Sequence, residues 1–173
     1  MATKASLLSL LPFILLATQL ASASIEEVCR KAAAGGRVNR GSCNKILRAA
    51  PGASAADDRG LAVIAGNLGA AHARATLPTI NKLLRSAGPA TKGPLQDCKE
   101  LYGNAVDDLK SAAASARSNR FADANIRFSA AMDASATCED GFSEKNVKSP
   151  LTAADSKLLL LATVGAAITH SGP

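Results

Sequence analysis

Residues 121–142 read FADANIRFSAAMDASATCEDGF, and this stretch decides the fold. Along it an apolar or small residue recurs every third or fourth position, and the two spacings alternate without a break. The residues on this stripe are Phe121, Ala124, Phe128, Ala131, Ser135, Cys138 and Phe142. A stripe with that period is one face of an amphipathic α-helix, which has 3.6 residues per turn. The stretch therefore predicts a long helix that buries this face.

Three other long segments carry the same period, and two short helical stretches precede them. The long segments are predicted at 57–84, with a kink at Pro78, at 94–116 and at 152–168. The short stretches, 25–34 and 42–50, are separated by the turn Gly35-Gly36. No segment of useful length alternates apolar and polar residues with the period of two that a β-strand shows, so the chain is expected to be all-α.

Several residues indicate where these helices begin. Ser42 is expected to cap the second short helix, and Pro94 is expected in the first turn of the second long helix. Asn119 is expected to cap the third, and Thr152-x-x-Asp155 has the form of a capping box for the fourth. Because the connections between the long helices are short, we expect antiparallel neighbours in an up-down-up-down four-helix bundle. Residues 24–52 would form a helical hairpin, and residues 53–173 the bundle.

The four cysteines, Cys29, Cys43, Cys98 and Cys138, allow three disulfide pairings. Cys98 lies early in the second long helix and Cys138 late in the third. If those helices are antiparallel neighbours, both cysteines fall at the same end of the bundle, each on its buried stripe. Cys29 and Cys43 flank the turn of the short hairpin. The predicted pairs are therefore Cys29–Cys43 and Cys98–Cys138.

The N-terminus has the pattern of a secretory signal peptide. Lys4 precedes an apolar run, 7–17, that is too short to span a bilayer, and Ala21-Ser22-Ala23 is a small-x-small cleavage pattern. We expect removal of residues 1–23 and secretion. The apolar run near the C-terminus, LLLLATVGAAIT at 158–169, is expected to be an ordinary buried helix and not part of a lipid-anchor signal.

Charge is unevenly distributed along the chain that would remain after removal of residues 1–23. Residues 24–92 contain eleven Lys and Arg against four Asp and Glu, whereas residues 93–173 contain eight against ten. A basic half in a secreted protein favours an anionic partner, and an acidic polysaccharide such as pectin is one. Nucleic acid is not expected, because the chain has one Tyr, four Phe and no Trp on which bases would stack. No membrane association is expected.

Motifs of enzyme chemistry are absent from the sequence. There is no G-x-S-x-G, H-E-x-x-H, phosphate-binding loop or dinucleotide fingerprint. The acid pairs Asp107-Asp108 and Glu139-Asp140 consist of adjacent residues, which point in different directions around a helix, so both are expected to be solvated. His72 and His170 show no metal-ligand spacing to the cysteines. We expect a binding module without cofactor or metal. A lipid carrier would need a hollow core, which alanine-rich stripes disfavour.

Several stretches resemble the plant invertase and pectin methylesterase inhibitor family. They are LQDCKELYGNAVDDL at 95–109, FSAAM at 128–132, TCEDGFSE at 137–144 and SPLT at 149–152, together with the placement of Cys29 and Cys43. The resemblance implies a four-helix bundle behind a helical hairpin, with two disulfides. It also implies an extracellular, cell-wall inhibitor of one of two enzymes.

The resemblance favours pectin methylesterase, with acid invertase as the alternative. Invertase inhibitors of this family plug the sugar cleft with a Pro-Lys-Phe segment at the start of the third long helix. The matching residues here are Asn119-Arg120-Phe121, which lack the proline. The chain as a whole is nevertheless similar to pollen proteins named as invertase inhibitors. The expected mechanism is steric, with faces of the second and third long helices covering the pectin-binding groove in a one-to-one complex. Expected contacts are Lys110, Arg117, Arg120, Asn125, Ser129 and Asp133.

Overall fold

The computed structural model describes residues 25–170, so the expected leader at 1–23 lies outside the described residues. Every regular element within this range is helical. A helix at 25–33 is followed by α2 (Arg40–Ala49), the 3-10 turn η1 (Ala53–Ala55), α3 (Asp58–Arg85), α4 (Pro89–Arg117), α5 (Phe121–Glu144) and α6 (Thr152–Thr169). The predicted all-α class is confirmed.

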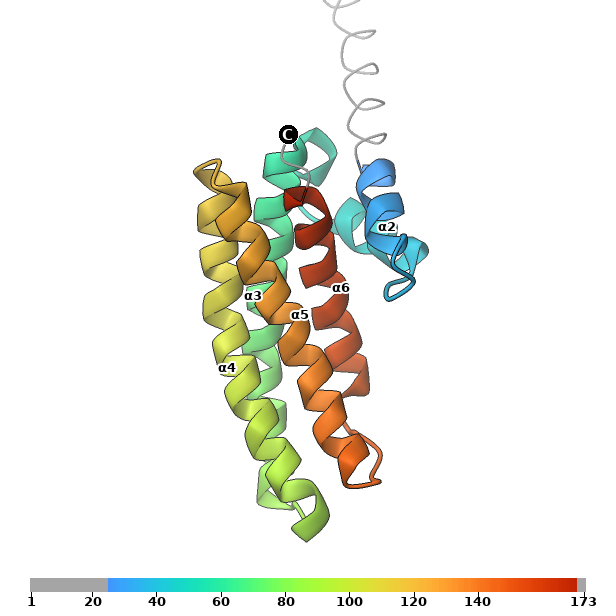
Figure 1. Ribbon diagram of the computed structural model, residues 1–173, viewed down its shortest axis with the longest axis vertical. Helices are drawn as coiled ribbons and strands as arrows, with labels where there is room; N and C mark the ends of the chain where they lie inside the picture. The colour runs from blue at the N-terminus through green and yellow to red at the C-terminus, as the bar shows by residue number, and fades with distance from the viewer. Residues whose placement is uncertain (1–24, 171–173) are drawn as a thin grey trace, which may run out of the picture.

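The four long helices form an antiparallel bundle (Figure 1). Helix α3 packs against α4 and α6, and α5 packs against the same two helices. The chain therefore runs up, down, up and down around one core, as predicted. Helix 25–33 and α2 form the hairpin, which lies beside α6 near one end of the bundle (Figure 1). Helix α3 continues through Pro78.

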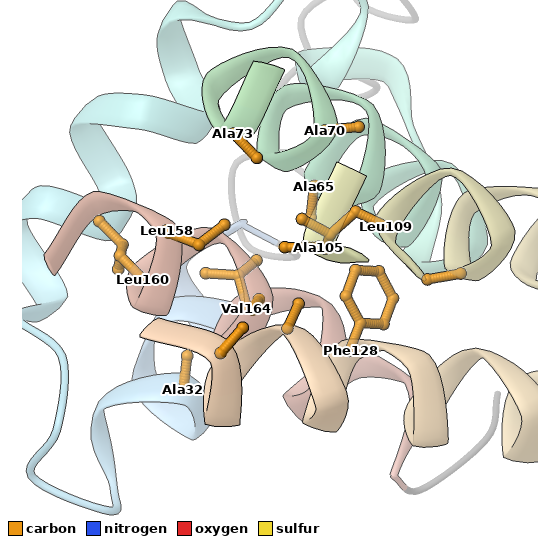
Figure 2. Packing of buried hydrophobic residues seen from close by; sticks show 14 of the residues in the cluster. Ala32, Ala65, Ala70, Ala73, Ala105, Leu109, Phe128, Leu158, Leu160 and Val164 are labelled. Atoms are coloured by element: carbon orange, nitrogen blue, oxygen red, sulfur yellow. The ribbon is translucent and has the colours of Figure 1, made fainter. Parts of the chain in front are cut away.

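The core of the bundle is built mainly from alanines and leucines, with the buried rings of Tyr102, Phe128 and Phe142 among them. Phe128 of α5 is fully buried and points toward Leu109 of α4 (Figure 2). Its ring lies against the backbone of α6 at Gly165, where any Cβ would overlap the ring. On the other side of the bundle a Cβ at Gly66 would lie 2.9 Å from the Leu109 carbonyl oxygen. These two glycines therefore allow α6 and α3 to approach their neighbours closely.

The two disulfides join the predicted pairs. Cys29–Cys43 links helix 25–33 to α2, and Cys98–Cys138 links α4 to α5. All four cysteines are buried. The linked residues are 14 and 40 positions apart, and chain-entropy arguments assign about 3 and about 4 kcal/mol to loops of those lengths.

Two predicted helix starts are wrong. Helix α2 begins earlier than expected because Asn39, not Ser42, is the cap, and its Oδ1 accepts a hydrogen bond from the Ser42 N–H at 3.0 Å. Helix α4 begins at Pro89, which places Pro94 inside the helix. Pro89 is the first residue of the helix. A backbone N–H at that position would have no intrahelical partner, so its absence in proline costs no hydrogen bond.

Asn119 does not cap α5, which corrects a further prediction. It ends α4 instead, with a φ of 57° in the left-handed region. The Asn119 N–H donates to the Ala116 carbonyl at 3.0 Å, and the Arg120 N–H donates to the Ser115 carbonyl at 2.9 Å. This pair of bonds is a Schellman motif, which satisfies the last carbonyls of a helix and favours Gly or Asn at the left-handed position.

The predicted capping box of α6 is also absent. The Thr152 hydroxyl donates to Glu139 Oε2 at 3.0 Å, and Asp155 turns into the core. There its Oδ1 accepts a hydrogen bond from the Tyr102 hydroxyl at 2.8 Å. A buried tyrosine hydroxyl needs a partner, and this need outweighs the capping preference. The stripe predicted for α6 is buried. The helix is long and apolar enough to cross a membrane, but half of it is buried inside the protein.

Candidate partner-binding surface

Helices α4 and α5 share an exposed face that carries charges of both signs. Arg127 of α5 donates to Asp108 of α4 at 2.8 Å, and Arg120 pairs with Asp123 at 3.6 Å. Most of these side chains are well exposed, so each pair contributes little to stability. The pairs do fix where the charged groups lie over the groove between the two helices.

Ile126 lies in the middle of these charges. Its side chain is 66% exposed, and no other large hydrophobic residue within 25–170 is exposed. It lines a groove of about 470 Å³ together with Ser111, Ala114, Ser115, Arg120, Asp123 and Arg127. An apolar side chain within a charged rim is the arrangement that binding sites use for an anchor. The sequence interpretation missed Ile126, although its place off the buried stripe of 121–142 was a usable signal.

The residues expected to contact a partner do not form one surface. Arg120 lines the α4–α5 groove, and Asp133 is exposed seven residues after Ile126, hence on the same face of α5. Lys110 lies two residues after Asp108, or about 200° around α4, so it points away from α5. Arg117, seven residues after Lys110, lies on that same distant face.

Asn125 and Ser129 lie on the opposite side of α5. The Asn125 Nδ2 group donates to the Ala166 carbonyl at 2.8 Å and to the Thr169 hydroxyl at 3.1 Å. Asn125 therefore ties α5 to α6. Together with Ser129 it lines a second groove, between α5, α6 and the N-terminal hairpin.

A cluster of polar side chains is buried beside the Cys98–Cys138 disulfide. Tyr102 of α4 donates to Asp155 of α6, and Glu139 of α5 accepts a hydrogen bond from Thr152. Tyr102 is fully buried and Asp155 is 2% exposed. Asp155 Oδ2 lies 3.4 Å from the Cys138 sulfur, a contact without a hydrogen bond because a disulfide sulfur carries no hydrogen. The cluster connects three helices.

The environment of the cluster shifts three pKa values. Burial raises the pKa of Asp155 to about 8, and Glu139 adds to the rise although the Tyr102 hydrogen bond opposes it. Burial alone would raise the pKa of Glu139, but hydrogen bonds from Asp155, Ser149 and Thr152 hold it below its ordinary value. Burial and the nearby Asp155 raise the pKa of Tyr102. At neutral pH Asp155 therefore keeps its proton, whereas Glu139 is ionised.

This carboxyl pair is placed for structure and not for chemistry on a substrate. Asp155 and Tyr102 have almost no surface, so no substrate atom reaches them. Glu139, expected to be solvated, is half-buried and bonded to the start of α6. Among residues 25–170 no group of His, Cys, Asp and Glu side chains has the geometry to hold a metal ion. The α4–α5 groove and the groove beside the hairpin, by contrast, are accessible to a partner.

The family model described as plant invertase/pectin methylesterase inhibitor matches residues 23–168. The chain is 37% identical over 159 residues to a Platanus acerifolia protein named "Putative invertase inhibitor", covering 90% of this chain and 89% of that one. It is 33% identical over 136 residues to the "Pectinesterase inhibitor" of Actinidia deliciosa, covering 78% and 71%.

The fold is also similar to a solved structure. It matches the crystal structure of a mutant form of a pectin methylesterase inhibitor from Arabidopsis, with a TM-score of 0.68 and 24% sequence identity. The alignment covers 78% of this chain and 91% of that one.

Proposed function

Because the chain belongs to the plant invertase/pectin methylesterase inhibitor family, we propose that it is a secreted inhibitor of pectin methylesterase. In this proposal the α4–α5 face covers the pectin-binding cleft of the enzyme in a one-to-one complex. The site of action is the plant cell wall, in keeping with the signal-peptide pattern at residues 1–23. The inhibitor performs no chemistry itself and acts by excluding the substrate.

The observation that carries the choice of enzyme is the backbone at Asn119. The resemblance assigns invertase inhibition to a Pro-Lys-Phe segment at this position. Proline requires a φ near −65° and has no N–H, whereas Asn119 has a φ of 57° and donates its N–H to Ala116. Phe121 is the first residue of α5 and is partly buried. This geometry supports a role for the segment in ending α4 and beginning α5, and disfavours a role as a plug.

The proposed contact surface follows from the α4–α5 groove. Ile126 supplies the apolar anchor, Arg120 and Arg127 supply cations, and Asp133 extends the face along α5. Lys110 and Arg117 lie outside this surface by the helical geometry of α4. Ser129 and Asn125 belong to the other groove and are not needed for inhibition.

Inhibition of acid invertase is the second candidate function. The observation in its favour is the name of the plane-tree relative, which is 37% identical to this chain. Both functions use the same fold, so the fold does not separate them. A direct assay against both enzymes separates them.

The test titrates the mature protein against a plant pectin methylesterase and an acid invertase in parallel. We expect inhibition of the esterase alone. Ile126→Ala and Arg120→Ala should each weaken that inhibition by about 1–2 kcal/mol, or roughly tenfold. Lys110→Ala is the matched control and should change it less than twofold. Potent inhibition of invertase with none of the esterase would refute the choice of enzyme, and equal losses for Ile126→Ala and Lys110→Ala would refute the surface.

A further inference from the structure

The groove between the N-terminal hairpin and helices α5 and α6, here called the hairpin groove, has a volume of about 570 Å³. The hairpin contributes Arg30, Lys31 and Arg37 to its lining, and His170 closes it at the end of α6. No Asp or Glu is among its lining residues. The hairpin groove is thus a concave site in which the charged side chains are cations.

The positive charge of the hairpin groove is only partly neutralised. Glu27 pairs with Arg30 at 2.6 Å and lies 4.0 Å from Lys31. Glu26 forms ion pairs with Arg40 and Arg48, which do not line the groove. Arg37 forms no ion pair with any described residue. The groove therefore retains net positive charge that an anionic ligand would complement.

The uncharged lining indicates what kind of anion fits. Thr163 contributes a hydroxyl that is buried and has no hydrogen-bond partner within residues 25–170. Ser129 and Asn125 add further polar groups. Among the described residues no Phe, Tyr or Trp lines the groove, so it lacks the large rings on which nucleobases stack. Cations and hydroxyl groups without Phe, Tyr or Trp suit a hydroxyl-rich chain that carries carboxylates, since arginine binds carboxylates with two parallel hydrogen bonds.

A groove of opposite charge lies toward the far end of the bundle. It has a volume of about 390 Å³, and Asp97, Glu100, Asp140 and Glu144 line it without a Lys or Arg. These residues come from the beginning of α4 and the end of α5, away from the hairpin (Figure 1). A polyanion would be attracted to the hairpin end and repelled from the other end, so the two grooves would together orient the protein on it.

We propose that the hairpin groove binds an acidic polysaccharide through its uronic-acid carboxylates, with de-esterified pectin as the natural polymer. The proposal rests on the proposed function only for the identity of that polymer. Ile126 lies on the α4 side of α5 and the hairpin groove on the α6 side. A polysaccharide in the hairpin groove therefore leaves the α4–α5 face open. The inhibitor would be held on the product of its target enzyme while it inhibits.

The test measures binding of the full mature protein to polygalacturonate by isothermal titration calorimetry at low and at physiological ionic strength. Binding should weaken as salt rises. Arg37→Glu and Lys31→Glu should each weaken it about tenfold, since each cation near an anionic surface is worth about fivefold and reversal adds repulsion. Lys92→Glu is the matched control. Lys92 is exposed in the first turn of α4 at the opposite end, and its substitution should change binding less than twofold.

Several outcomes would overturn the proposal. They are no measurable binding at low salt, equal losses for Lys92→Glu and Arg37→Glu, and equal affinity for fully methyl-esterified pectin, which lacks the carboxylates. Tighter Arg37-dependent binding of single-stranded DNA would also refute the ligand class. Esterase inhibition is measured separately on a soluble ester. A protein that binds polygalacturonate but does not inhibit refutes the proposed function alone, and one that inhibits but does not bind refutes this proposal alone.

Discussion

Asp155→Asn should stabilise this protein at pH 8 and leave it almost unchanged at pH 4. Folded Asp155 keeps its proton up to a pKa of about 8, whereas an unfolded aspartate ionises above 3.8. Between these values the folded state binds one more proton than the unfolded state. The free energy of unfolding must therefore fall as pH rises through this window. Asparagine has nearly the same shape as protonated aspartic acid. Its side chain can accept the hydrogen bond from the Tyr102 hydroxyl and donate one to Glu139, and it does not titrate.

The magnitude follows from the shift in pKa. A difference of about four pKa units corresponds to an upper limit of about 5–6 kcal/mol, at 1.36 kcal/mol for each unit. Relaxation around an ionised Asp155 would lower this figure, so we expect a gain of about 2–4 kcal/mol for Asp155→Asn at pH 8 relative to pH 4. The lowered pKa of Glu139 acts in the opposite sense but below pH 4.5, outside this window. Burial lowers the pKa of His72 in both proteins, so its contribution cancels in the comparison.

The measurement is urea unfolding of both proteins, with disulfides intact, at several pH values from 4 to 8. Asp140→Asn serves as the control, because Asp140 is an exposed acid on α5 next to Glu139. The difference between Asp155→Asn and wild type should grow with pH, while that between Asp140→Asn and wild type stays flat. A difference for Asp155→Asn that remains constant within about 0.5 kcal/mol would show that Asp155 holds no extra proton in the folded state.

Three further predictions concern the packing and the helix ends, and urea or thermal unfolding checks each. Phe128→Ala should cost about 3–5 kcal/mol because the ring is fully buried, whereas Asp123→Ala should stay within about 0.5; equal losses would contradict the assigned core. Gly165→Ala should cost at least about 1–3 kcal/mol, since its methyl group would overlap the Phe128 ring, and an unchanged midpoint would disprove that contact. Asn119→Pro should cost about 3 kcal/mol or more because of the φ of 57°, while Asn119→Gly should be nearly neutral; similar effects of both would argue against the left-handed turn.

The bundle and its disulfides were predictable because their signals repeat along the chain. One substitution does not hide a stripe of seven positions such as that of 121–142. Cys98 and Cys138 lay on two such stripes at expected neighbouring ends, so antiparallel packing was enough to pair them. Information of this kind is local in sequence and redundant, and it survives errors of a few residues in each helix boundary.

Single polar residues were predicted less well, because their partners are distant in sequence. Asp155 has the form of a helix cap when only residues 152–155 are considered, but its partner, Tyr102, is 53 positions away. One sign was available: Asp155 lies three residues before Leu158 and so continues the buried stripe of α6. Likewise Lys110 was expected to contact the partner together with residues of α5, but its angle on α4 became definite only when the Asp108–Arg127 pair fixed that angle.

The contact between Gly165 and Phe128 has a consequence for how this protein can diverge. The two residues lie on different helices and 37 positions apart, yet Gly165 has no room for a side chain while Phe128 keeps its ring. A larger side chain at 165 needs a smaller one at 128, and the order of the two substitutions matters. Loss of the ring first leaves a cavity, which a stable ancestor can tolerate, whereas growth at 165 first forces the helices apart. Descendants should therefore exchange these residues as a pair, and lineages that keep the ring should keep the glycine.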